Sequence, residues 1–348
     1  MAKSGNKFIR LIEQSIKFFQ LDLTGLNILI PTSIKEPSLT LLLAGMAGAK
    51  NIYVKSNEFN AVEKTYITDD LNIKSNISFI TEETPQLLSS LDVVIKGGNI
   101  SDIDFAFVSD LKENSVISIL PDKLDFYNID GIDLEACANK KIPVVAVNPN
   151  DPNLMLNRYF THIILKRCYD AGIELFRSRI LLIGNGELLE NTLKILKLNG
   201  ATVYAAYTNK PQIENYISKY LSSVDAVVAV DYPQSGELII GANGIIKIAD
   251  LVELNPDVEF IHFSGNVEGN TIKFAGISTT PEEIVKDKIN VNPEEFSLRL
   301  IIDTTAASMK IAESLIKSTN RTILPNESIV SYDIINADGP IVLGKIMF

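Results

Sequence analysis

The middle of the chain reads Ile180-Leu181-Leu182-Ile183-Gly184-Asn185-Gly186. The four apolar residues predict a short buried strand, and the Gly-x-Gly that follows predicts a tight turn into a helix over 188–198. A strand, a glycine turn and a helix in this order leave backbone N–H groups free at the helix N-terminus, where a pyrophosphate can bind. The stretch therefore predicts a Rossmann-type α/β domain.

The same alternation of strand and helix extends in both directions from this stretch. Short β-branched strands that alternate with helices indicate parallel pairing through right-handed crossovers, and hence doubly wound sheets. The expected strands are 27–30, 51–54, 77–80, 91–95, 115–120, 143–147, 180–183, 202–206, 225–230 and 258–263. The expected helices are 8–19, 37–49, 60–71, 132–139, 159–171, 188–198, 213–221 and 303–317.

One segment interrupts this alternation and predicts a domain crossing. It reads Asn148-Pro149-Asn150-Asp151-Pro152-Asn153, and two prolines among Asn and Asp are typical of a rigid, turn-rich connection. We expect the last helix to return to the first domain. The prediction is a discontinuous, flavodoxin-like α/β domain of residues 1–155 plus 303–348, and a Rossmann-type NAD(P)-binding domain of residues 156–302.

Composition excludes several classes of function. A net charge of −11 over 348 residues, with no basic stripe, argues against nucleic-acid binding. The longest apolar stretches, such as 39–49, are too short to span a bilayer, and the N-terminus lacks the apolar run of a signal peptide, so we expect a cytoplasmic protein that does not bind membranes. Cys137 and Cys168 lie in helical patterns, which favours two buried thiols over a disulfide or a nucleophile. The chain has none of the common metal-binding or hydrolase motifs, and no metal is expected.

The glycine turn departs from the dinucleotide fingerprint in two ways. Leu189 occupies the third glycine position, and no acidic residue follows the strand that ends near Tyr207. Because that carboxylate normally binds the ribose hydroxyl of NAD, its absence slightly favours NADP, whose 2′-phosphate Thr208, Asn209 and Lys210 could receive. Glu187 adds negative charge beside the expected phosphates. A Rossmann-shaped domain that binds no dinucleotide therefore remains an alternative.

Ligands in open α/β sheets bind outside the carboxyl ends of the strands, and this rule selects the candidate residues. Lys96 ends an apolar strand and is the best candidate for an anion contact, or else a solvated side chain. His262 ends another strand and is either a site residue or a structural one. Lys96 and His262 are the candidates for catalysis. The candidate cofactor-binding residues are Gly184, Asn185, Gly186, Leu188, Thr208, Asn209, Asp231 and Asn157.

Several stretches resemble two related families of two-domain Rossmann proteins. Residues 132–148, with Ile142-Pro143-Val144, are similar to the helix and strand that lead into the cofactor domain of D-2-hydroxyacid dehydrogenases, the formate and glycerate dehydrogenase type. Val147-Asn148, Asn157-Arg158-Tyr159, residues 40–56 and Phe260-Ile261-His262-Phe263-Ser264-Gly265 resemble S-adenosylhomocysteine hydrolase. The likeness spans about two thirds of the chain in the order of its elements.

The resemblance implies an NAD(P)-binding oxidoreductase that acts on a small molecule in the cleft between its domains, and a homodimer. It also implies catalytic residues that this chain lacks. Pro152-Asn153-Leu154-Met155-Leu156 has neither the Lys nor the Asp that the hydrolase family carries before its Asn-x-Tyr, and the Arg, Glu and late His of the dehydrogenases are not matched. The sequence therefore indicates a divergent member, and a catalytically degenerate ligand-binding or assembly protein is the alternative.

Overall fold

The computed structural model divides into two compact units, which we describe separately. Unit 1 comprises residues 1–154 and 298–348, and unit 2 comprises residues 155–297. The sequence analysis places these two boundaries after residues 155 and 302, one and five residues further along the chain. The structure describes residues 2–31, 37–55, 73–97, 102–121, 129–149, 151, 153–232, 235–285, 289–291, 295–318, 328–336 and 339–347.

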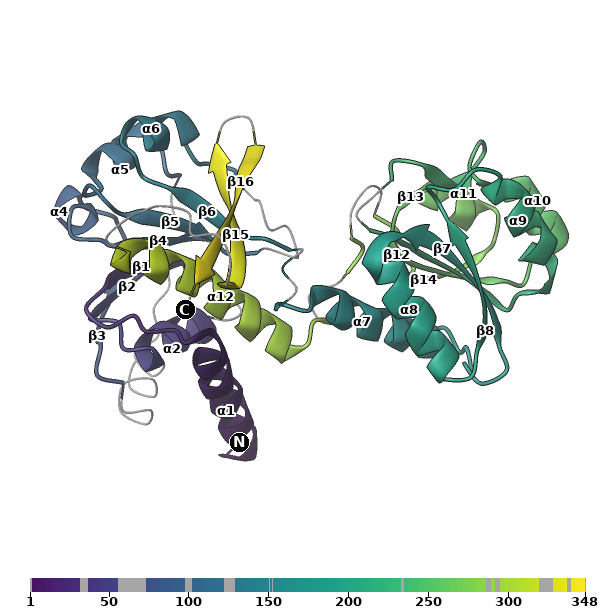
Figure 1. The fold of residues 1–348 in the computed structure, drawn as a ribbon, viewed down its shortest axis with the longest axis horizontal. Coiled ribbons are helices and arrows are strands. Elements are labelled where there is room, and N and C mark those ends of the chain that lie inside the picture. The colour runs from purple at the N-terminus through teal and green to yellow at the C-terminus, as the bar shows by residue number, and fades with distance from the viewer. Residues whose placement is uncertain are drawn as a thin grey trace. The chain divides into compact units, whose positions relative to one another are not determined.

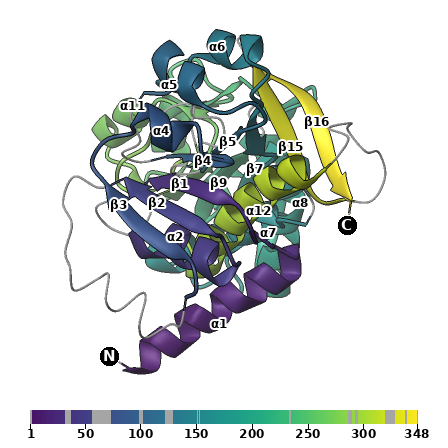
Figure 2. The same cartoon turned by 90° about the vertical axis from the view of Figure 1, so that its left-hand side faces the viewer.

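Unit 1 is built on one eight-stranded sheet with the order β16-β15-β6-β5-β4-β1-β2-β3 (Figures 1 and 2). The six inner strands are parallel, and a C-terminal hairpin adds two antiparallel strands beside β6. The strands are β1 Asn27–Pro31, β2 Asn51–Lys55, β3 Asn76–Ile80, β4 Val93–Lys96, β5 Val116–Ile119, β6 Val144–Val147, β15 Ser328–Asn336 and β16 Gly339–Met347. The parallel part has the order 3-2-1-4-5-6, which differs from the 2-1-3-4-5 order of flavodoxin-like sheets.

Helices cover both faces of this sheet. Helices α4, α5 and α6 pack on one face through Leu88, Phe107 and Cys137, while α1, α2 and α12 lie on the other (Figure 2). Their bounds are α1 Ala2–Phe19, α2 Pro37–Met46, α4 Pro85–Leu88, α5 Phe105–Asp110, α6 Leu134–Asn139 and α12 Leu298–Lys317. The helix expected over 60–71 lies outside the described residues.

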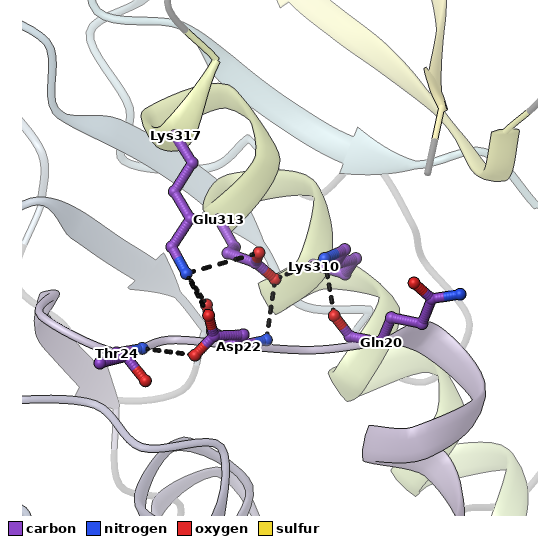
Figure 3. Close-up of polar contacts among 6 residues, drawn as sticks. All are labelled: Gln20, Asp22, Thr24, Lys310, Glu313 and Lys317. Atoms are coloured by element: carbon purple, nitrogen blue, oxygen red, sulfur yellow. Dashed lines mark hydrogen bonds and ion pairs between the residues drawn. The ribbon is translucent and has the colours of Figure 1, made fainter.

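Helix α12 returns to unit 1 and is fixed to the segment that links α1 to β1 (Figure 3). The ammonium of Lys310 donates to the backbone oxygen of Gln20 at 2.7 Å and pairs with Glu313 at 2.8 Å. Glu313 also accepts the backbone N–H of Asp22 at 3.0 Å, and Lys317 pairs with the Asp22 carboxylate at 2.8 Å. Chiefly because Lys317 binds it, Asp22 has its pKa lowered to about 2. Residues almost 300 positions apart are thereby held in one unit.

Unit 2 contains a five-stranded parallel sheet with the order β14-β12-β9-β7-β8 and a small three-stranded sheet with the order β11-β10-β13. Helices α7 and α8 pack on one face of the larger sheet, and α9, α10 and α11 pack on the other. The elements are α7 Leu156–Asp170, β7 Arg179–Asn185, α8 Gly186–Leu198, β8 Thr202–Tyr207, α9 Ile213–Tyr220, β9 Ala226–Asp231, β10 Leu238–Gly241, β11 Ile246–Lys247, α10 Ile248–Leu254, β12 Glu259–Ser264, β13 Asn266–Val267, α11 Gly269–Phe274 and β14 Ser278–Thr280.

The two-domain α/β fold class with doubly wound parallel sheets is confirmed. In unit 2 the strands expected from the sequence pattern form β7, β8, β9 and β12, and β7 and β9 are buried along almost their whole length. This burial on both faces is why they read as continuous apolar runs rather than as alternating ones. The small sheet and the C-terminal hairpin are additions that the sequence analysis does not foresee.

Candidate functional site

The carboxyl ends of the strands in unit 2 gather most of the predicted site residues. From β7 the chain passes to β8 on one side, and it then returns to β9 on the other side. The topological switch point therefore lies between β7 and β9, which is where ligands bind in open α/β sheets. Asn185 ends β7 and Asp231 ends β9, and the two residues are register partners.

Two glycines shape the turn from β7 into α8. A Cβ on Gly184 would lie 2.5 Å from the backbone oxygen of Val230, so only glycine allows β7 and β9 to approach this closely. Gly186 has a φ of +68°, a left-handed conformation that glycine adopts without strain. The glycines predicted for phosphate binding thus also have structural reasons to be glycine.

The N-terminus of α8 has no side-chain cap. Asn185 is the N-cap residue, but its side chain makes no hydrogen bond to the helix. The first-turn N–H groups consequently keep their partial positive charge and their donor capacity. This end of α8 can receive an anion.

Instead of capping, Asn185 joins a buried network around Asp231. One carboxylate oxygen of Asp231 accepts the Asn185 amide at 2.8 Å and the Thr208 hydroxyl at 2.8 Å. The other oxygen accepts the backbone N–H and the hydroxyl of Ser235, at 2.8 and 2.7 Å. Asp231 is 0% exposed, and these four donors match the roughly four acceptor positions of a carboxylate. The network therefore fixes the carboxyl ends of β7, β8 and β9 relative to one another.

Three of the residues predicted to bind the cofactor, Asn185, Thr208 and Asp231, meet in this network. The sequence analysis does not identify the fourth member, Ser235. Its signal is weak: Ser235-Gly236 belongs to the turn after β9, and such turns often supply N–H and hydroxyl donors.

The first turn of α8 also carries a carboxylate. Glu187 accepts the side-chain amides of Asn157 at 3.0 Å and of Asn191 at 3.3 Å. The predicted residue Asn157 therefore lies beside the N-terminus of α8, where it contacts Glu187. Since both partners are neutral amides, the negative charge of Glu187 remains at the place where phosphates are expected.

His262 is completely buried in unit 2. Its Nε2 lies 3.0 Å from the Gly265 carbonyl oxygen, which can only accept, so Nε2 carries the proton. Its Nδ1 accepts from the Asn290 amide at 3.4 Å. Burial, assisted by the charge of Arg167, lowers the pKa of His262 to about 4. The ring is neutral at pH 7 with both nitrogens bonded, which favours the structural interpretation over the catalytic one.

Arg167 lies in the same buried region and holds two segments together. Its guanidinium makes a bidentate pair with Glu295, with distances of 2.7 and 2.6 Å, and donates to the backbone oxygens of His262 and Asn290. An Arg, a Glu and a His thus meet inside unit 2. The guanidinium contacts the His262 carbonyl and not its ring, so the three side chains do not form an acid–base set.

Two buried polar atoms at the end of β12 lack a hydrogen-bond partner among the described residues. They are Ser264 Oγ and Asn266 Oδ1, which flank Gly265. Ser264 is 0% exposed and pairs across the sheet with Val230, next to Asp231. Because an unbonded buried polar atom costs free energy, a polar partner at this edge would stabilise the unit.

The remaining predicted residues are dispersed. Leu188 has a fully buried side chain, so only its backbone can contact a ligand. Asn209 and Lys210 are exposed after β8, and the Lys210 ammonium lies 4.5 Å from the centre of the Tyr207 ring. Lys96 ends β4 in unit 1 and is half-buried.

Cys137 and Cys168 are free, buried thiols. Burial raises the pKa of Cys137 to about 11 and that of Cys168 to about 12. Both are protonated at neutral pH and therefore poor nucleophiles. Among the residues that the structure describes, no cluster of His, Cys, Asp and Glu is arranged to hold a metal ion. None of the described helices combines the length and apolar composition needed to cross a bilayer.

Comparison with known proteins shows similarity at the level of the fold. No protein-family model and no curated protein sequence matches the chain. The crystal structure of a dipicolinate synthase component from Bacillus halodurans superposes with a TM-score of 0.55 and 10% identity, over 85% of this chain and 99% of that one. The chain is similar in fold to this component of dipicolinate synthase. The corresponding Bacillus subtilis protein gives a TM-score of 0.51 with 11% identity, over 86% of this chain and 97% of that one.

A D-lactate dehydrogenase with NAD+ from Lactobacillus jensenii matches at a TM-score of 0.48 with 13% identity, over 80% of this chain and 100% of that one. The two dipicolinate synthase structures, with TM-scores above 0.5, show a likeness of fold, and their low identities fit a divergent chain. The finer likeness to S-adenosylhomocysteine hydrolase stays a prediction.

Proposed function

We propose that unit 2 binds a nicotinamide dinucleotide at the carboxyl ends of β7 and β9, and that the protein is an NAD(P)-dependent oxidoreductase of a small molecule. One observation carries this proposal: the uncapped N-terminus of α8 follows a glycine turn at the topological switch point of a parallel sheet. Free N–H groups and the helix dipole at this position suit a pyrophosphate.

The residues present fit such a ligand in two further respects. Gly186 has no side chain to obstruct the approach of a phosphate to the first turn of α8. Ser264 Oγ and Asn266 Oδ1 offer unused hydrogen-bonding capacity at the next strand end. A bound nicotinamide supplies hydride transfer, while the chain orients it.

We favour NADP over NAD, on the chemistry of the residues after β8. No carboxylate follows this strand to bind a ribose 2′-hydroxyl, and the Lys210 ammonium is exposed there. Thr208 is not part of this argument, because its hydroxyl donates to Asp231. The expected order of affinity is therefore NADPH and NADP above NADH and NAD.

The test is calorimetric titration of the purified protein with each of these four dinucleotides. We expect at least one to bind with micromolar affinity, which corresponds to about −8 kcal/mol. Gly186→Val should abolish the binding, since its side chain would enter the phosphate position. The matched control is Gly172→Val, because Gly172 also has a positive φ but has no atom within 4 Å of a new Cβ.

If the folded protein gives no heat of binding with any of the four dinucleotides, the proposal is contradicted. The alternative would then be a catalytically degenerate binding or assembly protein with no dinucleotide. Two observations would support it: Glu187 keeps a negative charge at the start of α8, and the chain itself fills the acceptor positions of Asp231.

A further inference from the structure

The larger sheet of unit 2 lacks one strand of the complete doubly wound order. In the order 3-2-1-4-5-6, a third strand covers the outer edge of the second strand. Unit 2 has the order β14-β12-β9-β7-β8, in which β7 is the first strand and β8 is the second. Between β8 and β9, where every residue is described, the chain forms only α9 and the short 3-10 helix Leu221–Ser223. The third strand is therefore absent, and β8 is the edge of the sheet.

The backbone of β8 turns three of its residues away from β7. The N–H groups of Thr202 and Thr208 donate to the backbone oxygens of residues 178 and 184, at 2.8 and 2.9 Å. Backbone groups alternate in direction along a strand, so the even-numbered residues of β8 face β7 and the odd-numbered ones face outward. No described residue accepts a hydrogen bond from the outward N–H groups, which belong to Val203, Ala205 and Tyr207.

The strand β8 carries none of the features that protect an exposed edge from pairing. Such edges are usually short, or they contain charged side chains, prolines or bulges. Residues 202–207 read Thr-Val-Tyr-Ala-Ala-Tyr, a strand of six residues without a charge or a proline, and their register with β7 has no shift. The opposite edge strand, β14, has only three residues and is followed by Pro281. Of the two edges of this sheet, β8 is thus the one that is open to another strand.

We propose that β8 pairs antiparallel with β8 of a second copy of this chain, about a two-fold axis at Ala205. In this register Ala205 lies opposite Ala205 and Val203 lies opposite Tyr207, so the outward N–H groups of each copy meet outward carbonyl groups of the other. Two identical strands close on themselves only in this antiparallel arrangement, and the assembly therefore stops at two copies. The interface occupies the place of the missing third strand, and a sheet with the complete order could not form it.

The side chains of β8 are also complementary in this register. Tyr204 lies on the face that carries α9 and meets Ala206 of the second copy. On the other face, where Tyr207 contacts α8 through a hydrogen bond to its carboxylate at 2.8 Å, Tyr207 meets Val203 of the second copy. A large side chain is therefore placed opposite a smaller one at each of these positions, and aromatic groups opposite β-branched ones stabilise paired strands.

Two exposed apolar side chains extend this surface. Phe176 and Leu198 are 68% and 73% exposed. Phe176 packs against Gly200, and Leu198 ends α8, so both lie beside the amino end of β8. In the antiparallel pair this end of one strand meets the carboxyl end of the other. The two side chains therefore lie where the second copy approaches, and large exposed apolar groups are typical of such contact surfaces.

The test is sedimentation equilibrium over a series of concentrations for the wild type, Ala205→Pro and the control Ala205→Ser. Proline at this position removes the outward N–H and leaves the hydrogen bonds to β7 in place, whereas serine keeps both the N–H and the small size. We expect the wild type and Ala205→Ser to dimerise equally. In Ala205→Pro the dissociation constant should rise roughly tenfold or more, because the two-fold axis removes the same hydrogen bond from both copies.

Two results of this experiment would overturn the proposal. One is an Ala205→Pro variant that dimerises as tightly as the wild type. The other is a wild type that stays monomeric, which would leave the edge of β8 to an extended peptide of another protein.

A second measurement needs no variant, in case Ala205→Pro does not fold. Amide hydrogen exchange of the wild type is compared, residue by residue, at protein concentrations below and above the dissociation constant of the dimer. Exchange at Val203, Ala205 and Tyr207 should slow severalfold in the dimer, while Tyr204 and Ala206, which face β7, stay equally protected. A dimer in which the outward amides exchange as fast as in the monomer pairs through another surface and would overturn the proposal.

Discussion

At the scale of single residues, unit 2 places charged and titratable side chains at buried strand ends and satisfies most of them internally. Asp231 receives four hydrogen bonds, and Arg167, which is 1% exposed, is matched by Glu295 and two carbonyl oxygens. Buried charges persist in proteins only with such partners. Ser264 and Asn266 are the exceptions at this edge, because each has a buried polar atom without a hydrogen-bond partner among the described residues, and for that reason they support a ligand there.

His262 predicts a specific pH dependence of stability. Its pKa falls from 6.5 to about 4 on folding, so the unfolded chain takes up a proton first as the pH decreases. Stability is therefore lost between pH 6.5 and pH 4, by about 2 kcal/mol from pH 7 to pH 5. The measurement is the free energy of unfolding, obtained from urea unfolding curves at pH 7 and at pH 5. His262→Gln should remove the contribution of His262 from the difference between these two free energies.

The matched control is the other histidine of the chain. His162 is exposed on α7, and His162→Gln should leave the pH dependence of the wild type unchanged. If His262→Gln and the wild type lose the same free energy between pH 7 and pH 5, then His262 is not the buried neutral group described above.

Sequence reasoning locates these residues at strand ends but does not identify their partners. His262 and Asp231 could be placed because apolar strand patterns end at them. Ser235, Asn290 and Glu295 could not, because they belong to loops whose path depends on tertiary packing and not on local pattern. The interpretation of His262 as structural follows only once its two hydrogen bonds are known.

At the scale of elements, the contact between β7 and β9 depends on Gly184. Its missing Cβ would lie 2.5 Å from the oxygen and 2.6 Å from the carbonyl carbon of Val230. Since both are backbone atoms of a central strand, they cannot move aside at low cost. Gly184→Ala should therefore destabilise the protein by about 2 to 3 kcal/mol, measured by urea unfolding.

Gly172→Ala is the control for Gly184→Ala. Gly172 has a φ of +75° and open space around a new Cβ, so it carries only the conformational cost of a left-handed alanine, about 1 kcal/mol. Equal losses of stability in the two variants would show that close strand packing is not what requires glycine at position 184.

The elements that the sequence predicts best are those with continuous apolar runs. The strands β1, β2, β6, β7 and β9 are found where those runs occur, because burial on both faces leaves a strong signal. The sequence analysis does not predict the hairpin of β15 and β16, although Asp338-Gly339 between two β-branched segments is a hairpin signal. The very short strands β11 and β13 have too few residues to show any periodicity.

At the scale of the whole molecule, the discontinuous first unit follows from helix α12. The sequence indicates that the last helix returns to unit 1. It does not indicate the contacts that hold this helix, because they come from charged residues without any local pattern. These contacts join Lys310, Glu313 and Lys317 to residues 20–22 (Figure 3). The order of strands in unit 1 is likewise not determined by local pattern, because it depends on which side of β1 each crossover turns.

The resemblance to dimeric dehydrogenases predicts a homodimer. Multi-angle light scattering of the purified protein should give about twice the 38.3 kDa of one chain. A mass that stays near 38.3 kDa across the concentration range would remove this prediction, together with the pairing of β8, and would leave the dinucleotide proposal unaffected.

Amide hydrogen exchange, with and without each of the four nicotinamide dinucleotides in large excess, tests the central claim most directly. If unit 2 binds a dinucleotide as proposed, exchange slows at residues 184–188, where the N–H groups of α8 receive the pyrophosphate, and at residues 264–266 at the end of β12. Unchanged exchange at residues 184–188 with all four dinucleotides, or protection confined to other parts of the chain, would contradict the account.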